Sequence, residues 1–184
     1  PSHSTHYIQT DFKIHEYCQN IEKLGKEFHS IRMCIYWKDI LRGKVQEFMK
    51  HGFECVTAGH MFDPLFLPRL KSIIDVSTIT ASNNPQTHVG YCIQMGKPHF
   101  IFDFNPQCVG IGEIGKANLS RGVKGDTSAK EIRDAFSECR DDIAHYQIDV
   151  VDRYWGLSEF RTKEEIQLLF SVTEDMYNRS REHF

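Results

Sequence analysis

The sequence contains no uninterrupted apolar segment long enough to cross a membrane. None of its apolar runs approaches about 18 residues, the shortest length usual for a transmembrane helix. No secretory signal peptide is visible at the start either. The first of these absences excludes a transmembrane helix. The 184-residue chain begins at Pro1 and not at methionine, so we expect a processed or truncated piece of a longer protein.

Several motifs of catalysis and metal binding are missing as well. There is no G-x-S-x-G nucleophile motif, no P-loop and no H-E-x-x-H zinc motif, although ten histidines are present. No C-x-x-C pair occurs among the six cysteines, and Cys34, Cys55 and Cys92 lie inside apolar segments. We therefore predict buried free thiols in a cytoplasmic protein that has no metal site and no cofactor.

The chain also lacks a strong excess of either charge. Its formal charge is −3, with 40% hydrophobic and 26% charged residues, which is the composition of a soluble globular protein. Because there is no basic patch, a nucleic-acid partner is not expected. The length suits a single core of ordinary size.

What the chain does contain is an alternation of strand and helix patterns. Four short β-branched or apolar segments predict strands: residues 30–37, 54–58, 77–81 and 99–104. Three segments of helical periodicity lie between them: residues 43–51, 64–75 and 87–95. Asp63 followed by Pro64 is a typical helix start, and Gly96 is a typical stop. The order β-α-β-α-β-α-β predicts an α/β fold, a Rossmann-like parallel sheet with helices on both faces.

The flanking segments divide the chain into three parts. Residues 1–29 predict an irregular lead-in with a helix within it, and residues 30–127 form the Rossmann-like core. Residues 128–184 predict a helical C-terminal cap of three helices. Ser128-x-x-Glu131 and Thr162-x-x-Glu165 are capping boxes that open two of these helices.

A glycine-rich segment, residues 105–125, ends the predicted core. It contains Gly110, Gly112 and Gly115 at the spacing of a dinucleotide fingerprint. The context differs from a true fingerprint, which opens a helix in the first βα turn, because this segment follows the fourth strand and shows no amphipathic pattern. We therefore interpret it as a mobile loop.

Polar side chains follow the predicted strands at their carboxyl ends, where doubly wound sheets bind ligands. The candidate phosphate-binding residues are Lys38, His60, Ser82, Asn83, Thr87, His88, Val89 and Gly90. The last four open a predicted helix, whose N–H groups and dipole favour an anion. Simpler explanations stay open: Thr87 as an N-cap, His88 as a surface histidine, Gly90 as a packing glycine and Lys38 as a solvated lysine.

The same segment resembles a known family. The sequence from Ser82 to Tyr91, followed by Gly96-Lys97-Pro98, is similar to the donor-binding half of GT-B glycosyltransferases, especially bacterial enzymes of surface-polysaccharide synthesis. The segment from Ala58 to Asp63 and the Tyr154-Trp-Gly156 motif look like the same group. The order of elements agrees over roughly residues 30–180, but the specific motif covers only about 10 to 20 residues.

The resemblance implies a nucleotide-sugar donor bound at the strand ends. Its phosphates would meet the N–H groups of Thr87, His88 and Val89, and His88 is the candidate that stabilises the leaving group. A glycan acceptor and any general base would belong mostly to a missing N-terminal domain, so the catalytic residues stay unassigned. The expected location is cytoplasmic, which for such an enzyme includes the inner face of the membrane.

One departure from the family leaves the stereochemistry open. Many retaining members carry a Glu-x₇-Glu pair near the donor loop, whereas the only pair at this spacing here is Glu174 and Glu182 in the tail. Two other hypotheses also remain: an enzyme like the nucleotide-sugar 2-epimerases, and a non-catalytic module that binds a nucleotide or another phospholigand. An NAD-dependent dehydrogenase would use the glycine-rich segment, and we expect no such binding.

Overall fold

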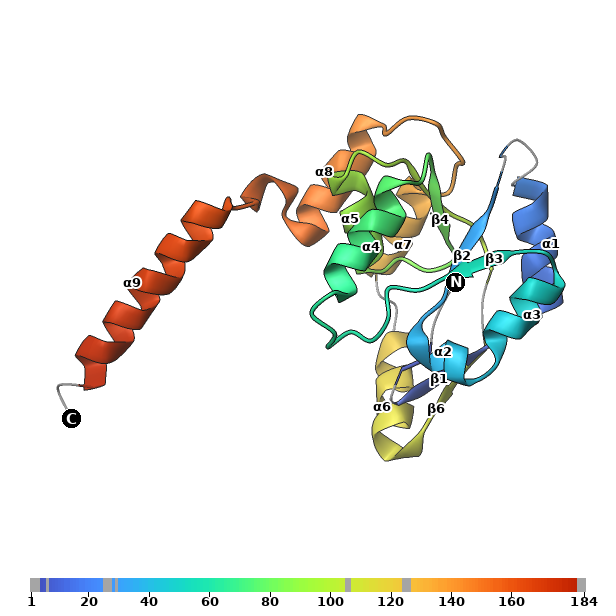
Figure 1. Ribbon diagram of the computed structural model, residues 1–184, viewed down its shortest axis with the longest axis horizontal. Helices are drawn as coiled ribbons and strands as arrows, with labels where there is room; N and C mark the ends of the chain where they lie inside the picture. The colour runs from blue at the N-terminus through green and yellow to red at the C-terminus, as the bar shows by residue number, and fades with distance from the viewer. Residues whose placement is uncertain are drawn as a thin grey trace.

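The computed structural model describes residues 4–5, 7–24, 28, 30–104, 107–123 and 127–181. It shows a mixed α/β fold with short strands and many helices (Figure 1). The strands are β1 (Ile8–Asp11), β2 (Arg32–Cys34), β3 (Glu54–Val56), β4 (Thr80–Ser82), β5 (His99–Ile101) and β6 (Gln107–Gly110). The helices are α1 (Ile14–Leu24), α2 (Trp37–Leu41), α3 (Lys44–Lys50), α4 (Phe66–Asp75), α5 (Thr87–Gln94), α6 (Gly112–Val123), α7 (Thr127–Ala135), α8 (His145–Trp155), the 3-10 helix η2 (Leu157–Glu159) and α9 (Lys163–Arg181).

The four predicted core strands are present, and they pair in parallel. Strand β2 pairs with β3, with Met33 opposite Cys55, and β4 pairs with β5, with Ala81 opposite Phe100. Each strand is shorter than the sequence pattern predicted. The first predicted strand, residues 30–37, is present only as β2, which ends at Cys34. Trp37 and Lys38 belong to the short helix α2.

Helices pack on both sides of β5, because its alternate side chains enter two different cores. Phe100 of β5, and Phe102 directly after the strand, lie in a core with residues of α1, α3 and β2. Ile101 lies in a second core with residues of α5, α7 and α8. This alternation is the period of two expected of a strand that is buried on both faces.

The parallel pairs are separate two-stranded sheets in the described residues and do not form one continuous sheet. One reason lies at β5. The Phe102 N–H donates to Ser82 on β4, so the Ile101 N–H points away from β4, and it donates at 2.7 Å to the carbonyl of Phe136. The end of α7 therefore occupies a position that a further strand would need.

The described residues of the glycine-rich segment form a strand and a helix, which corrects the interpretation of this part as a loop. Its described residues form β6 and α6, and β6 pairs antiparallel with β1 (Figure 1). A Cβ on Gly115 would overlap the carbonyl oxygen of Tyr7 and the backbone of Gly110. The glycines therefore allow α6 to pack closely on the β1–β6 pair. Residues 105–106 and 124–125 of the predicted loop lie outside the described residues.

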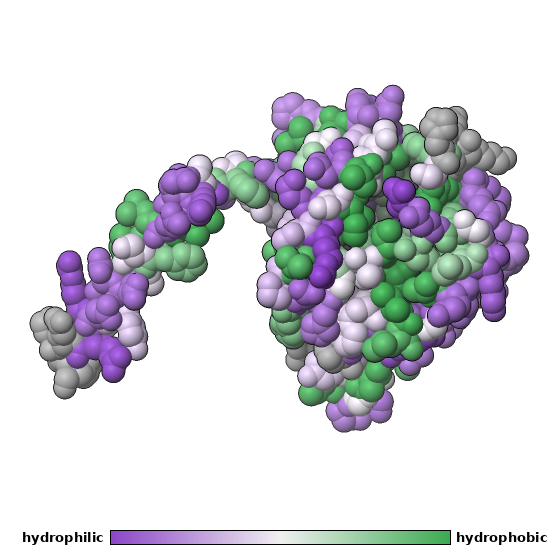
Figure 2. Space-filling view, viewed as in Figure 1, coloured by the Kyte–Doolittle hydropathy of each residue, from purple (hydrophilic) through white to green (hydrophobic). Residues whose placement is uncertain are grey.

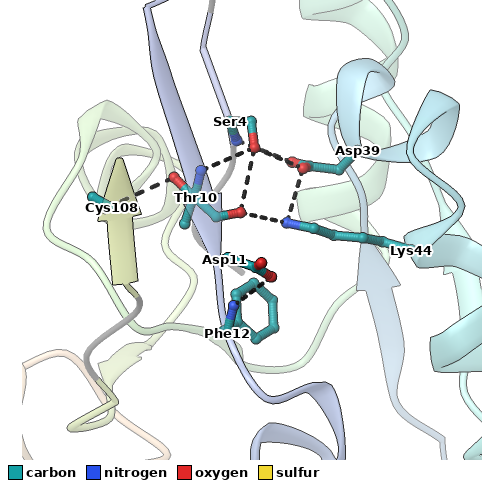
Figure 3. Close-up of polar contacts among 7 residues, drawn as sticks. All are labelled: Ser4, Thr10, Asp11, Phe12, Asp39, Lys44 and Cys108. Atoms are coloured by element: carbon teal, nitrogen blue, oxygen red, sulfur yellow. Dashed lines mark hydrogen bonds and ion pairs between the residues drawn. The ribbon is translucent and has the colours of Figure 1, made fainter. Parts of the chain in front are cut away.

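A buried polar network ties the N-terminal segment to α2 and α3 (Figure 3). Lys44 Nζ lies 2.9 Å from Asp39 Oδ1 and donates to the carbonyl of Thr10 at 2.9 Å. The backbone N–H and the hydroxyl of Ser4 donate to the Asp39 carboxylate at 3.1 and 3.0 Å. The two charged side chains are only 5% and 10% exposed. Together with β1, this network makes the described residues between 4 and 11 part of the fold, where we had predicted an irregular lead-in.

The C-terminal helices follow their sequence signals only in part. Gly156 stops α8 with φ = 66°. The Thr162–Glu165 capping box is confirmed, with hydrogen bonds of 2.7 and 3.2 Å. Glu131 accepts hydrogen bonds from Arg153 and, at 2.5 Å, from the Tyr154 hydroxyl, which links α7 to α8. The prediction of a three-helix cap is wrong for α9, which has no buried residue and extends away from the body (Figure 1).

Candidate phosphate-binding site

The end of β4 is built by side chains that point into the fold. Ser82 is 5% exposed, donates its hydroxyl to the carbonyl of Asn84 at 3.1 Å and lies 3.0 Å from His99 Nε2. Asn83 is fully buried, and its Nδ2 donates to the carbonyl of Phe104 at 3.2 Å. Both side chains therefore hold the shape of the loop, and neither is directed at a ligand from the exposed surface.

Beneath this loop lies a histidine that sequence reasoning missed. His99 is 3% exposed, and its Nδ1 is 2.8 Å from Thr80 Oγ1. Burial, together with the nearby His88, holds the pKa of His99 well below its usual range, so the ring is neutral. His88 packs edge-on against this ring, with centroids 5.3 Å apart. His88 is thus half-buried, because one side of its ring contacts His99 and not solvent.

Helix α5 begins at Thr87, as predicted, but the roles of its first residues differ. Gln86 is the N-cap, so Thr87 is the first helical residue and carries an exposed hydroxyl. Val89 is fully buried, and its N–H donates to the carbonyl of Gln86 at 2.9 Å. That N–H is therefore occupied, which corrects its prediction as a phosphate donor.

Gly90 serves helix packing. A Cβ at this position would lie 3.1 Å from Trp155 Cγ on α8, closer than an ordinary contact. The packing explanation therefore accounts for this glycine, because the face of α5 that carries it is covered by Trp155.

The next buried residue of the helix, Cys92, has its pKa raised to about 11 by burial, so its thiol is protonated and does not act as a nucleophile.

The ends of β2 and β3 form the second part of the site. The rings of Trp37 and His60 lie 4.5 Å apart, and Lys38 Nζ lies 5.6 Å from the Trp37 ring. His60 Nδ1 accepts the N–H of Phe62 at 3.1 Å. The neutral ring therefore carries its proton on Nε2, which becomes the hydrogen-bond donor of this residue. Lys38 and His60 thus both lie near the Trp37 ring, each after one of two neighbouring parallel strands.

Arg133 is a cation of the site that the sequence did not reveal. It comes from α7, is half-buried, and donates from Nη1 to the carbonyl of Asn83 at 3.3 Å. Its guanidinium thus reaches the loop after β4 across a separation of 50 residues. No local motif marks it, because α7 reaches this loop only through tertiary packing.

A cavity of about 500 Å³ lies elsewhere, between the edge of β3 and α4. Its lining is mainly apolar and contains none of the predicted site residues. The lining residues are Val56, Thr57, Leu65, Pro68, Arg69, Ser72 and Ile73. The Arg69 side chain pairs with Asp63 at 2.6 Å, which lowers the pKa of that carboxyl. Asp63 Oδ1 also accepts the Leu65 N–H at 2.8 Å, so it forms a turn ahead of α4, which starts at Phe66 and not at Pro64.

Comparisons with family models, with curated proteins and with solved structures give no match to this chain. In the part of the chain that the structure describes, no three metal-binding side chains converge. None of the described helices has both the length and the apolar character needed to cross a membrane. Any inference about the function of this chain therefore starts from the geometry of its strand ends.

Proposed function

We propose that this chain is the nucleotide-sugar donor-binding half of a glycosyltransferase, which transfers a sugar to a polysaccharide or oligosaccharide acceptor. In this proposal the two parallel strand pairs belong to a Rossmann-like arrangement, and the donor lies at their carboxyl ends. The observation that carries the proposal is that polar side chains follow each of β2, β3 and β4 at its carboxyl end. Helix α5 follows β4 directly, so its N-terminus adds a positive dipole.

Four groups at these ends suit a phosphate. Lys38 supplies a cation, and His60 supplies an N–H donor whose tautomer is set by Phe62. The exposed hydroxyl of Thr87 stands at the start of α5. Arg133 supports the loop after β4 through the Asn83 carbonyl. These groups favour a dianionic ligand over a neutral one.

The same groups would assist glycosyl transfer by binding the leaving group. When the bond between sugar and phosphate breaks, negative charge develops on the departing nucleotide phosphate. Donors already fixed in place stabilise that charge without reorganising. His88 at the start of α5 is the side chain we propose for this role. Its ring packs against the neutral ring of His99.

Calorimetric titration with UDP, GDP and CMP tests the site. We expect one of these nucleotides to bind, and His60→Ala and His88→Ala each to weaken that binding about tenfold, because each loses a hydrogen bond to a charged group. His145→Ala is the matched control, since His145 is an exposed histidine on α8. Unchanged affinity in both site variants would rule out this location, and thermal melting of each variant separates lost binding from lost folding.

Product analysis separates the proposed transferase from the remaining hypotheses. An epimerase-like enzyme would convert the nucleotide sugar with no acceptor present, whereas a transferase needs the acceptor. A non-catalytic module would bind the nucleotide and leave the sugar unchanged under both conditions, even in the full-length protein.

A further inference from the structure

Helix α9 is an exposed element that the nucleotide site does not use. None of its residues is buried, and it extends away from the rest of the molecule (Figure 1). Figure 2 shows apolar side chains over its middle and hydrophilic ones toward its C-terminal end. Isolated helices of this length are marginal in water, so a helix in this position needs a partner for its apolar side.

The apolar residues of α9 form a face wide enough to be covered. Seven large apolar side chains on the helix are exposed: Ile166, Leu168, Leu169, Phe170, Val172, Met176 and Tyr177. At about 100° per residue, Ile166, Leu169 and Met176 lie on one side of the helix, and Ser171 lies on the opposite side. The exposed fractions reach 72% at Phe170. Monomeric proteins rarely expose a continuous patch of this kind.

The charges of α9 indicate which partner fits. Glu164 and Glu165 lie in the first turn, and Arg179 and Arg181 lie in the last turn. In a parallel pair of two such helices each charged side chain would lie beside the identical side chain of the other helix, so like charges would repel. In an antiparallel pair the acidic start of one helix lies beside the basic end of the other, and the two helix dipoles also oppose each other favourably.

We propose that α9 pairs antiparallel with α9 of a second copy of this chain, so that the two apolar faces cover each other. The pairing centres near Val172, the middle residue of the Lys163–Arg181 helix, and places Glu165 beside Arg179 of the second copy. Since α9 contributes no residue to the two cores, the dimer forms without altering them. Formation of this dimer does not depend on nucleotide binding.

Sedimentation of the chain over a range of concentrations tests the dimer. We expect the sedimenting species to have twice the 21.4 kDa monomer mass at protein concentrations well below about 100 μM. A dissociation constant of about 100 μM or more would correspond to weak association only. Leu169→Asp should give a monomer because it places a charge in the middle of the apolar face. Ser171→Asp, on the polar side, should leave the dimer intact. A wild-type chain that stays monomeric at about 100 μM, or a dimer that survives Leu169→Asp, overturns the proposal.

A charge exchange tests the antiparallel direction. Arg179→Glu should weaken the dimer about tenfold, because it places two carboxylates side by side at both symmetric contacts. Adding Glu165→Lys should restore the affinity, although this change also removes the Glu165 capping bond to Thr162. Glu174→Lys, on the polar side, is the control and should have little effect. A double variant that dimerises no better than Arg179→Glu alone contradicts the antiparallel arrangement.

Discussion

At the scale of single residues, the candidate site depends on side chains whose roles are set by burial. His99 and Asn83 are almost completely buried and hold the loop after β4, whereas Lys38, His60 and Thr87 keep part of their surface exposed. The sequence identifies polar residues at strand ends, but it does not show which of them face inward. That distinction decides which residues can meet a ligand and which ones fix the loop.

We expect mild acid to destabilise the fold through His99. The unfolded chain protonates this imidazole near about pH 6.5, whereas the buried ring in the native chain stays neutral. Below that pH the unfolded state binds one more proton, so the free energy of unfolding falls as pH decreases, by up to about 1.4 kcal/mol per pH unit. Urea denaturation of wild type and His99→Gln at about pH 7.5 and about pH 5.5 measures this loss. An equal loss in both proteins would exclude His99 as its source.

The buried ion pair of Asp39 and Lys44 gives a second prediction at this scale. Asp39→Ala should lower the free energy of unfolding by about 3 kcal/mol or more, because it leaves the Lys44 ammonium buried without its carboxylate. Asp75→Ala is the matched control, since the pair it breaks with Lys71 is 68% and 59% exposed and contributes less than about 1 kcal/mol. Similar losses in the two variants, measured by urea denaturation, would show that the buried network does not anchor the N-terminal segment.

At the scale of elements, local signals predicted the helices and the parallel strands better than the segments around them. Gly52 and Gly96 have positive φ directly after two predicted helices, residues 43–51 and 87–95. In contrast, β1, β6 and α6 were not predicted. Strand β1 is stabilised by pairing with β6 almost 100 residues away. Helix α6 has little amphipathic pattern, and its close contact with β1 and β6 is made at Gly115, which has no side chain. Such non-local pairing leaves no periodic signal in either segment alone.

The close packing of α6 predicts a large effect of one methyl group. Gly115→Ala should destabilise the unit formed by β1, β6 and α6 by about 2 kcal/mol or more, because the new Cβ would overlap the Tyr7 carbonyl, which is backbone and cannot rotate away. Lys116→Ala, at an exposed neighbour, should change stability by less than about 0.5 kcal/mol. Chemical denaturation compares the two. If Gly115→Ala is as stable as wild type, the glycine-rich segment does not pack as described.

At the scale of the whole molecule, the body and α9 are energetically separate. The two cores contain residues of α1, α3, α5, α7 and α8 but none of α9. Truncation before Lys163 should therefore leave the melting temperature of the dilute monomer within about 2 °C of wild type. A much larger loss in a differential scanning experiment would mean that α9 supports the body directly.

We propose ligand binding from three features together: the parallel strand pairs, the two cores on either side of β5 and the polar strand ends. A ligand that binds only the folded chain raises its melting temperature by an amount set by concentration and affinity. The most direct measurement is therefore a thermal-shift series with UDP, GDP, CMP, ADP and NAD on the wild-type chain. We predict that one nucleoside phosphate raises the melting temperature, that the rise at the same ligand concentration is smaller in His60→Ala, and that NAD has no effect. A shift with NAD alone, or none with any nucleotide at millimolar concentration, would contradict the proposal that this chain binds a nucleotide-sugar donor.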